Sequence, residues 1–145
     1  MPILPIDTGR YGSPEMRRVF EEGERLQRFL DVEAALAKAQ AELGIIPREA
    51  AEAIASKASV KYVKLERVKE IEARIKHDLM AVVEALEEAC GPLGRFVHFG
   101  ATSYDIEDTA TALQLREALA IIESRLLELA RILAELAERY AELVM

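Results

Sequence analysis

The chain has 145 residues, 51% of them hydrophobic, and a net charge of -7, which is enough for one domain or for part of a larger protein. The acidic charge argues against nucleic-acid binding, which requires basic patches. No uncharged apolar stretch approaches the roughly 18 residues that a membrane span needs, and no secretory signal opens the chain. We therefore expect a soluble, cytoplasmic protein. Asparagine is absent while Glu, Lys and Arg are abundant, a composition that hints at a thermophilic source.

Residues 1–12 predict an extended arm, because two prolines and two glycines fall within them. The arm contains Arg10 and Tyr11. A guanidinium beside a phenol can bind a phosphate, but the same two residues can be an ordinary surface pair. Ser13 and Pro14 then predict the start of a short helix that runs to about Gly23.

A strong helix is predicted over residues 24–43, where apolar residues recur at helical spacing and Gly44 supplies a stop. Glu33 falls in the middle of the apolar stripe. A carboxylate there must find a hydrogen-bond partner or shift its pKa, and we interpret it as a structural residue rather than a catalyst. Pro47 predicts a second, alanine-rich helix to about Lys57, followed by a loop.

Residues 65–90 predict one continuous helix with an apolar face. His77 lies almost opposite that face at about 100° per residue. Small residues beside His77 suggest that its side of the helix is a second contact surface, and Lys76, His77 and Asp78 bring a cation, a titratable imidazole and a carboxylate into one turn. An exposed polar turn is the alternative interpretation.

Residues 96–109 carry His98 and a Gly-Ala-Thr-Ser loop that opens into the last helix. A flexible glycine, two hydroxyls and a helix N-terminus favour an anion such as a carboxylate. Ser, Thr and Asp in front of an apolar run also form a plain helix cap. We expect Asp105 to cap the helix while Thr102 and Ser103, a turn earlier, face the ligand.

A long helix is predicted from about Asp105 to the last residue. Its apolar positions step by four and three without a break: Leu115, Leu119, Ile122, Leu126, Leu129, Leu133, Leu136, Tyr140 and Leu143. This heptad pattern favours a bundle or coiled-coil helix of roughly 60 Å. Further apolar residues lie outside this heptad stripe, so we expect the helix to pack against several neighbouring helices. No Gly or Pro stop signal precedes Met145, and we expect the chain to end within the helix.

Recognised motifs for a metal or a bound nucleotide are missing from the sequence. Two histidines and one cysteine, Cys90, fit no zinc spacing and allow no intrachain disulfide. The glycine loops that hold nucleotides and the nucleophile elbow of hydrolases are absent as well. We therefore expect no metal site.

Several short motifs occur in order along the chain. They are Arg10-Tyr11 with Pro14-Glu15-Met16, Asp31 to Ala37, Gly44-Ile45-Ile46-Pro47, Lys76-His77-Asp78, and His98 to Ser103. Each motif alone is weak, but together they closely resemble the N-terminal part of the adenylosuccinate lyases, a family of the fumarase/aspartase superfamily. The resemblance runs from Arg10 to the end of the chain. The Lys-His-Asp element favours this family over its fumarase, argininosuccinate lyase and cycloisomerase relatives.

The resemblance implies an all-α protein, with an N-terminal helical domain over residues 1–104 and the first long helix of a central bundle domain over residues 105–145. It implies a homotetramer that needs no cofactor and no metal. The implied reaction is β-elimination of fumarate from adenylosuccinate, giving AMP, and from the succinylaminoimidazole carboxamide ribotide of purine biosynthesis.

The resemblance also implies a set of substrate-binding residues: Arg10, Tyr11, Lys76, His77, Asp78, His98, Thr102 and Ser103. The first two would lie near the nucleotide phosphate, and Thr102 and Ser103 would bind the succinyl carboxylate. His77 would orient or polarise the substrate as an auxiliary catalytic residue.

The groups that would move protons are absent. The family places its general acid in a Gly-Arg-Thr-His-Gly-Gln-like motif and its general base in a Ser-Ser-x-Met-Pro-x-Lys-x-Asn-Pro loop, and this chain contains neither. Elimination needs a base for the Cβ proton and an acid for the departing nitrogen, so we expect the isolated chain to be inactive. Two alternatives remain open: a non-catalytic helical oligomerisation module, and a cycloisomerase-like relative that binds a muconate-type acid.

Overall fold

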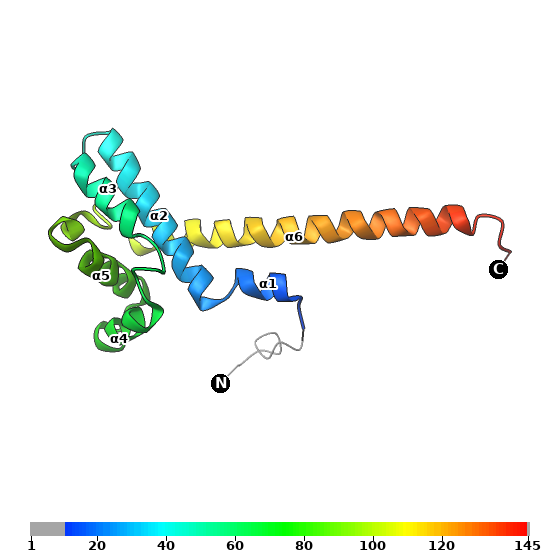
Figure 1. The fold of residues 1–145 in the computed structure, drawn as a ribbon, viewed down its shortest axis with the longest axis horizontal. Coiled ribbons are helices and arrows are strands. Elements are labelled where there is room, and N and C mark those ends of the chain that lie inside the picture. The colour runs from blue at the N-terminus through cyan, green and yellow to red at the C-terminus, as the bar shows by residue number, and fades with distance from the viewer. Residues whose placement is uncertain (1–10, 145) are drawn as a thin grey trace.

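The computed structural model describes residues 11–144. This part of the chain is helical and contains no strand, which confirms the all-α prediction. Its helices are α1 (Pro14–Val19), α2 (Glu22–Glu42), α3 (Arg48–Lys57), α4 (Leu65–Ile75), α5 (Asp78–Cys90), the 3-10 helix η2 (Gly91–Phe96) and α6 (Ser103–Arg139). In Figure 1, α2 to α5 gather at one end of α6, which extends away from them as a rod.

Helix α2 lies at the centre of this group and contacts α3 and α6 most extensively. Its predicted apolar stripe is buried at Leu26, Phe29, Leu30 and Ala37, whereas Leu43, just beyond its last turn, is exposed. It ends at Glu42, and Gly44 follows with a φ of +72°, a conformation that glycine adopts without strain. The helix α3 begins directly after Pro47, as predicted.

The hydrophobic core draws on five helices. Its largest fully buried apolar side chains are Leu30, Ile54, Val63, Ile71, Leu79, Leu86 and Ile106. Burying a side chain of this size stabilises a fold by about 1.5–3 kcal/mol. The core therefore joins α2, α3, α4, α5 and the first turns of α6 into one unit.

Close packing of η2 on α5 depends on Gly94. A Cβ built on this residue would lie 2.4 Å from the carbonyl oxygen of Glu87 and 2.7 Å from its Cα. Because both atoms belong to the backbone, neither can move aside as a flexible side chain would. The glycine therefore allows the chain to turn back over α5 just before His98.

The predicted continuous helix over residues 65–90 is wrong, because the chain breaks between α4 and α5. Lys76 takes a left-handed conformation with a φ of 60°, and its N–H donates to Glu72. His77 is extended and becomes the N-cap of α5. The apolar spacing continues across the break, and neither Gly nor Pro marks it, so periodicity alone gave no sign of two helices.

Helix α6 is buried along one stripe in its first half only. Ile106, Ala110, Gln114 and Ala118 follow one another at intervals of four and face α1 and α2. Side chains from Ile122 onward are exposed. The helix ends at Arg139 and Tyr140 follows as its C-cap, so the expectation of a helix to the last residue is wrong.

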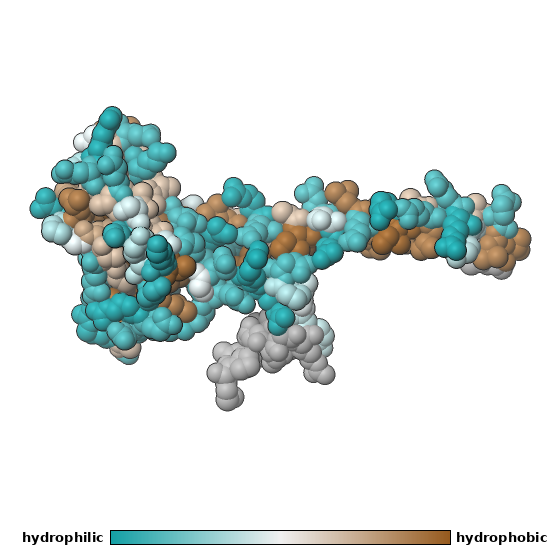
Figure 2. Space-filling view, in the orientation of Figure 1, coloured by the Kyte–Doolittle hydropathy of each residue, from teal (hydrophilic) through white to brown (hydrophobic). Residues whose placement is uncertain are grey.

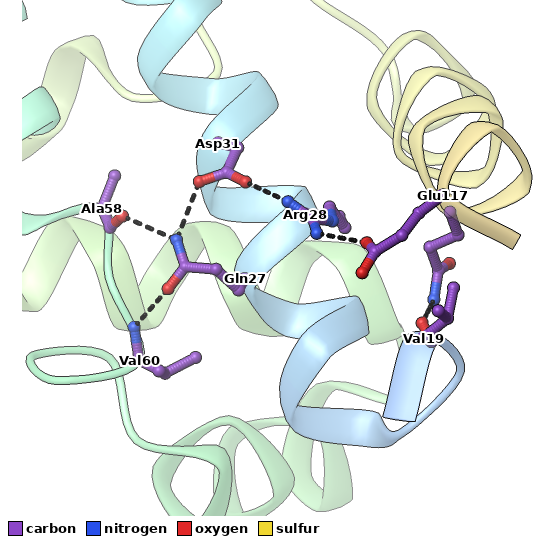
Figure 3. Close-up of polar contacts among 8 residues, drawn as sticks. Val19, Gln27, Arg28, Asp31, Ala58, Val60 and Glu117 are labelled. Atoms are coloured by element: carbon purple, nitrogen blue, oxygen red, sulfur yellow. Dashed lines mark hydrogen bonds and ion pairs between the residues drawn. The ribbon is translucent and has the colours of Figure 1, made fainter. Parts of the chain in front are cut away.

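Polar side chains tie the elements around α2 together (Figure 3). The amide nitrogen of Gln27 donates to Ala58 O at 3.2 Å, and its oxygen accepts from Val60 N at 3.0 Å, which fixes the loop between α3 and α4. Arg28 reaches from α2 to Glu117 of α6 at 2.7 Å. These bonds hold α6 and the neighbouring loop at defined positions against α2.

Candidate functional site

The side chain of His98 is anchored to α2. It follows η2, its backbone takes a φ of 57°, and only 9% of its side chain is exposed. Its Nδ1 lies 2.6 Å from Oε1 of Glu33, whose side chain is completely buried. The prediction that this carboxylate needs a hydrogen-bond partner is thereby confirmed, and the partner is His98.

A second side chain of α2 holds the same loop. The amide nitrogen of Gln40 donates to the carbonyl oxygen of Phe99 at 2.6 Å. Glu33 and Gln40 are seven residues apart, which places them two turns apart on one face of the helix. Helical spacing gave no sign of this contact between Gln40 and the loop.

Burial raises the pKa of Glu33, and the imidazole of His98 opposes that rise. Taking a carboxylate out of water is costly unless it is paired. Its second oxygen, Oε2, is buried without a hydrogen-bond partner among the described residues. The bond to His98 is therefore the main compensation for burying this group.

Thr102, not Asp105, is the N-cap of α6. Asp105 occupies the third helical position, and its carboxylate accepts the backbone N–H of Thr102 at 2.9 Å in a capping box. The expectation that Asp105 is the cap and Thr102 lies a turn earlier is wrong. The acidic residue at this helix start is explained by the cap, because Asp105 satisfies a backbone donor.

His77 acts as a helix cap as well. Its Nδ1 accepts the backbone N–H of Met80 at 3.3 Å, and the same atom lies 3.6 Å from Oδ1 of Asp78. While Nδ1 accepts this bond it carries no hydrogen, so the proton lies on Nε2. The side chain is about half exposed, and Nε2 is available to a ligand.

The predicted site residues form local groups. In the described part of the chain, no hydrogen bond or ion pair joins Lys76–Asp78 to His98–Ser103. Asp78 lines a cavity of about 240 Å³ whose other lining residues come from α2, α4 and α5. Tyr11 is exposed, and Arg10 lies outside the described residues. Convergence of these groups on one substrate therefore stays a prediction.

Comparison with known proteins identifies the family. Residues 9–145 match the sequence model of a family described as Lyase. This match covers nearly the whole chain, and the chain belongs to that lyase family. Within residues 11–144, no helix combines the length and the apolar character required to cross a bilayer.

Individual relatives are similar over most of the chain. It is 60% identical to the adenylosuccinate lyase of Pyrococcus abyssi over 99% of its length, and 46% identical to the N-acetyl-S-(2-succino)cysteine lyase of Dickeya dadantii over 77%. The crystal structure of a fumarate lyase from Mesorhizobium sp. BNC1 superposes with a TM-score of 0.81 at 38% identity, covering 89% of the chain. The chain spans 32%, 25% and 31%, respectively, of these three proteins.

Proposed function

We propose that this chain is the substrate-binding N-terminal part of an enzyme that eliminates fumarate from adenylosuccinate, giving AMP, and from the succinylaminoimidazole carboxamide ribotide of purine biosynthesis. The observation that carries the proposal is the 60% identity over 99% of the chain to a relative named adenylosuccinate lyase. The name of the Dickeya relative also contains a succino group, attached there to sulfur. Both names describe a lyase whose substrate carries a succino group on a heteroatom, nitrogen in one and sulfur in the other.

The proposed elimination requires a base, an acid and residues that bind the substrate. A base removes the proton from Cβ of the succinyl group, the C–N bond breaks, the C–H electrons form the double bond of fumarate, and an acid protonates the departing nitrogen. The motifs that supply base and acid in the family are absent from this sequence. We therefore assign the residues of this chain to binding and orientation. The resemblance to the adenylosuccinate lyases implies that the reaction needs no metal or cofactor.

The binding roles follow the chemistry of each group. Thr102 and Ser103 stand at the N-terminus of the 37-residue helix α6, where backbone N–H groups and the helix dipole favour a carboxylate. The second group, Lys76–Asp78, supplies a cation and the exposed imidazole of His77 to orient the substrate. The Arg10-Tyr11 pair suits the phosphate, and His98 contributes its second ring nitrogen.

Assembly into a homotetramer is part of the proposal. Helix α6 exposes large apolar side chains from its middle outward, among them Leu119 at 62%, Leu126 at 59% and Leu133 at 56%, and Figure 2 shows apolar surface along the rod. An open, mostly apolar face of this one helix extends from Ala112 to Ala130. Contiguous apolar surface of this kind marks an interface, and heptad spacing suits a helical bundle. A cytoplasmic location accords with a nucleotide substrate.

Fumarate release tests the proposed reaction. A full-length lyase carrying these residues is mixed with adenylosuccinate, and the absorbance change is followed. We expect turnover by the full-length protein and none by the 145-residue chain alone. Turnover by the pure chain would contradict the division of tasks. A full-length protein that ignores adenylosuccinate but lactonises a carboxymuconate would favour the cycloisomerase-like alternative.

The exposed apolar side chains of α6 also favour the second candidate, a non-catalytic oligomerisation module. Sedimentation combined with titration by adenylosuccinate separates the two. Both candidates predict self-association that is lost in a Leu126→Glu/Leu133→Glu variant. The lyase binds the nucleotide as well, whereas a scaffold would associate and show no binding.

A further inference from the structure

The loop that carries His98 is held by two side chains from one face of α2. Glu33 bonds to the imidazole at 2.6 Å, and Gln40 bonds to the next backbone carbonyl, that of Phe99, also at 2.6 Å. One bond fixes the ring and the other fixes the backbone beside it. Together they determine both the position and the orientation of one imidazole.

The orientation leaves a single ring nitrogen for a ligand. Nδ1 of His98 is occupied by Glu33, and the structure shows no bond between Nε2 and any described residue. The side chain is 9% exposed, so little of the ring besides that nitrogen remains accessible. Four residues further along the chain, Thr102 is the N-cap of α6, so His98 and the proposed carboxylate-binding residues belong to one short segment.

Fold stability alone does not explain the buried Glu33–His98 pair. Glu33 is buried with one oxygen unpaired among the described residues, and His98 has a left-handed backbone. Replacing a buried ion pair by apolar side chains of similar volume is often neutral or stabilising. Strained backbone and buried charge of this kind cluster where a side chain must be held for function.

We propose that Glu33 is a positioning residue: its carboxylate accepts the Nδ1 hydrogen of His98 and fixes the imidazole so that Nε2 alone faces the substrate. Gln40 supports the same geometry through Phe99. The role of the pair toward a substrate rests on the proposed function, whereas the state of the ring does not depend on it.

The ring state is tested by long-range ¹H–¹⁵N spectra of the ¹⁵N-histidine-labelled chain. The chain has two histidines, and His77→Gln assigns the spectrum. We expect a hydrogen on Nδ1 of His98. Glu33→Gln has nearly the same shape, but an amide can present its oxygen or its nitrogen to the ring, so we expect a mixture of tautomers. Glu33→Asp keeps the carboxylate and should keep the Nδ1 hydrogen.

Turnover is measured with the same variants in a full-length lyase carrying these residues. We expect Glu33→Gln to lower kcat by about 10- to 100-fold, the range seen when a partner that orients a metal-binding histidine is lost, with KM changed less than kcat. The Glu33→Asp variant should recover part of kcat. A Gln40→Leu variant should lower kcat less than Glu33→Gln and leave the Nδ1 hydrogen in place.

A purely structural role gives a different pattern. A Glu33→Gln variant that melts at lower temperature but keeps one tautomer and the wild-type kcat would overturn the proposal. So would a mixture of tautomers in Glu33→Asp, which serves as the second variant if Glu33→Gln does not fold. A wild-type enzyme that releases no fumarate would refute the proposed function, while the spectra would still decide whether Glu33 fixes the ring.

Discussion

The buried side-chain amide of Gln114 donates a hydrogen bond to the carbonyl oxygen of Val19 at 2.7 Å, which ties the end of α1 to α6. Both residues are almost completely covered, at 5% and 2% exposure. This bond sets where α1 lies against α6.

Replacing Gln114 by Leu should be clearly destabilising. The buried carbonyl of Val19 would lose its partner, which costs about 1–3 kcal/mol. Thermal unfolding measures the loss, and hydrogen exchange should increase in α1. The control is Arg125→Ala, because Arg125 also joins α1 to α6 through Glu15, at 2.6 Å. That pair is exposed, and exposed pairs contribute about 0–1 kcal/mol. Equal losses in both variants would contradict the importance of the buried bond.

Gly94→Ala should disrupt the turn over α5. The new Cβ would lie 2.4 Å from the backbone oxygen of Glu87, and overpacking of this kind costs about 1–3 kcal/mol or more. The matched control is Gly23→Ala near the start of α2, where a Cβ meets no atom within 4 Å. Removing a glycine from a helix stabilises it by about 0.5–1 kcal/mol. Unfolding in denaturant should therefore move the two midpoints in opposite directions, and a shift in the same direction would contradict the packing.

Glu87→Gln should stabilise the fold in a pH-dependent manner. Burial raises the pKa of Glu87, and the nearby Glu84 raises it further. A raised carboxyl pKa means that stability is lost as the pH rises from the ordinary value through the folded-state value, because the fold disfavours the charge. An uncharged Gln removes that loss. We expect a gain of at most about 0.5 kcal/mol at neutral pH, after allowance for solvent screening.

Melting temperatures at several pH values check the direction of this pH dependence. The difference between Glu87→Gln and wild type should vanish below the ordinary range of a carboxyl group, where Glu87 is protonated in both folded and unfolded chains. A gain that grows as the pH falls would show that the cause lies elsewhere.

Substitutions at the start of α6 should separate capping from binding. Asp105→Ala removes the acceptor for Thr102 N–H and should cost about 0.5–1.5 kcal/mol of stability, the net contribution of one hydrogen bond. In a full-length lyase carrying these residues, Ser103→Ala should instead weaken substrate binding or turnover far more than it lowers the melting temperature. A Ser103→Ala variant with unchanged kinetics would contradict a binding role for this residue.

Helical spacing in the sequence predicted most of the fold because each long helix buries one stripe. The helices α2 and α3 begin and end close to their predicted bounds, since Gly44 and Pro47 mark the turn between them. The break at Lys76 was missed, because a lysine with a φ of 60° follows from the packing of α4 on α5 and not from its residue type. A weak signal existed: His77 followed by an acid in the first turn is compatible with a new helix start.

The sequence around each residue indicated which residues matter in the site, but not which residues contact one another. The position of Glu33 in an apolar stripe showed that it needs a partner, but the partner lies 65 residues away. Helical periodicity carries no information on which distant loop returns to a given helix face. The contact between Gln40 and Phe99 escaped notice for the same reason, since its acceptor is a backbone carbonyl that any residue provides.

The preference of a full-length lyase carrying these residues for its succino substrate tests the account most directly. The measurement is fumarate released from adenylosuccinate and from N-acetyl-S-(2-succino)cysteine, expressed as kcat/KM for each. We predict at least a hundredfold preference for adenylosuccinate, about 2.7 kcal/mol in transition-state binding. Equal rates, or faster release from the cysteine derivative, would contradict the assignment of this chain to a nucleotide substrate.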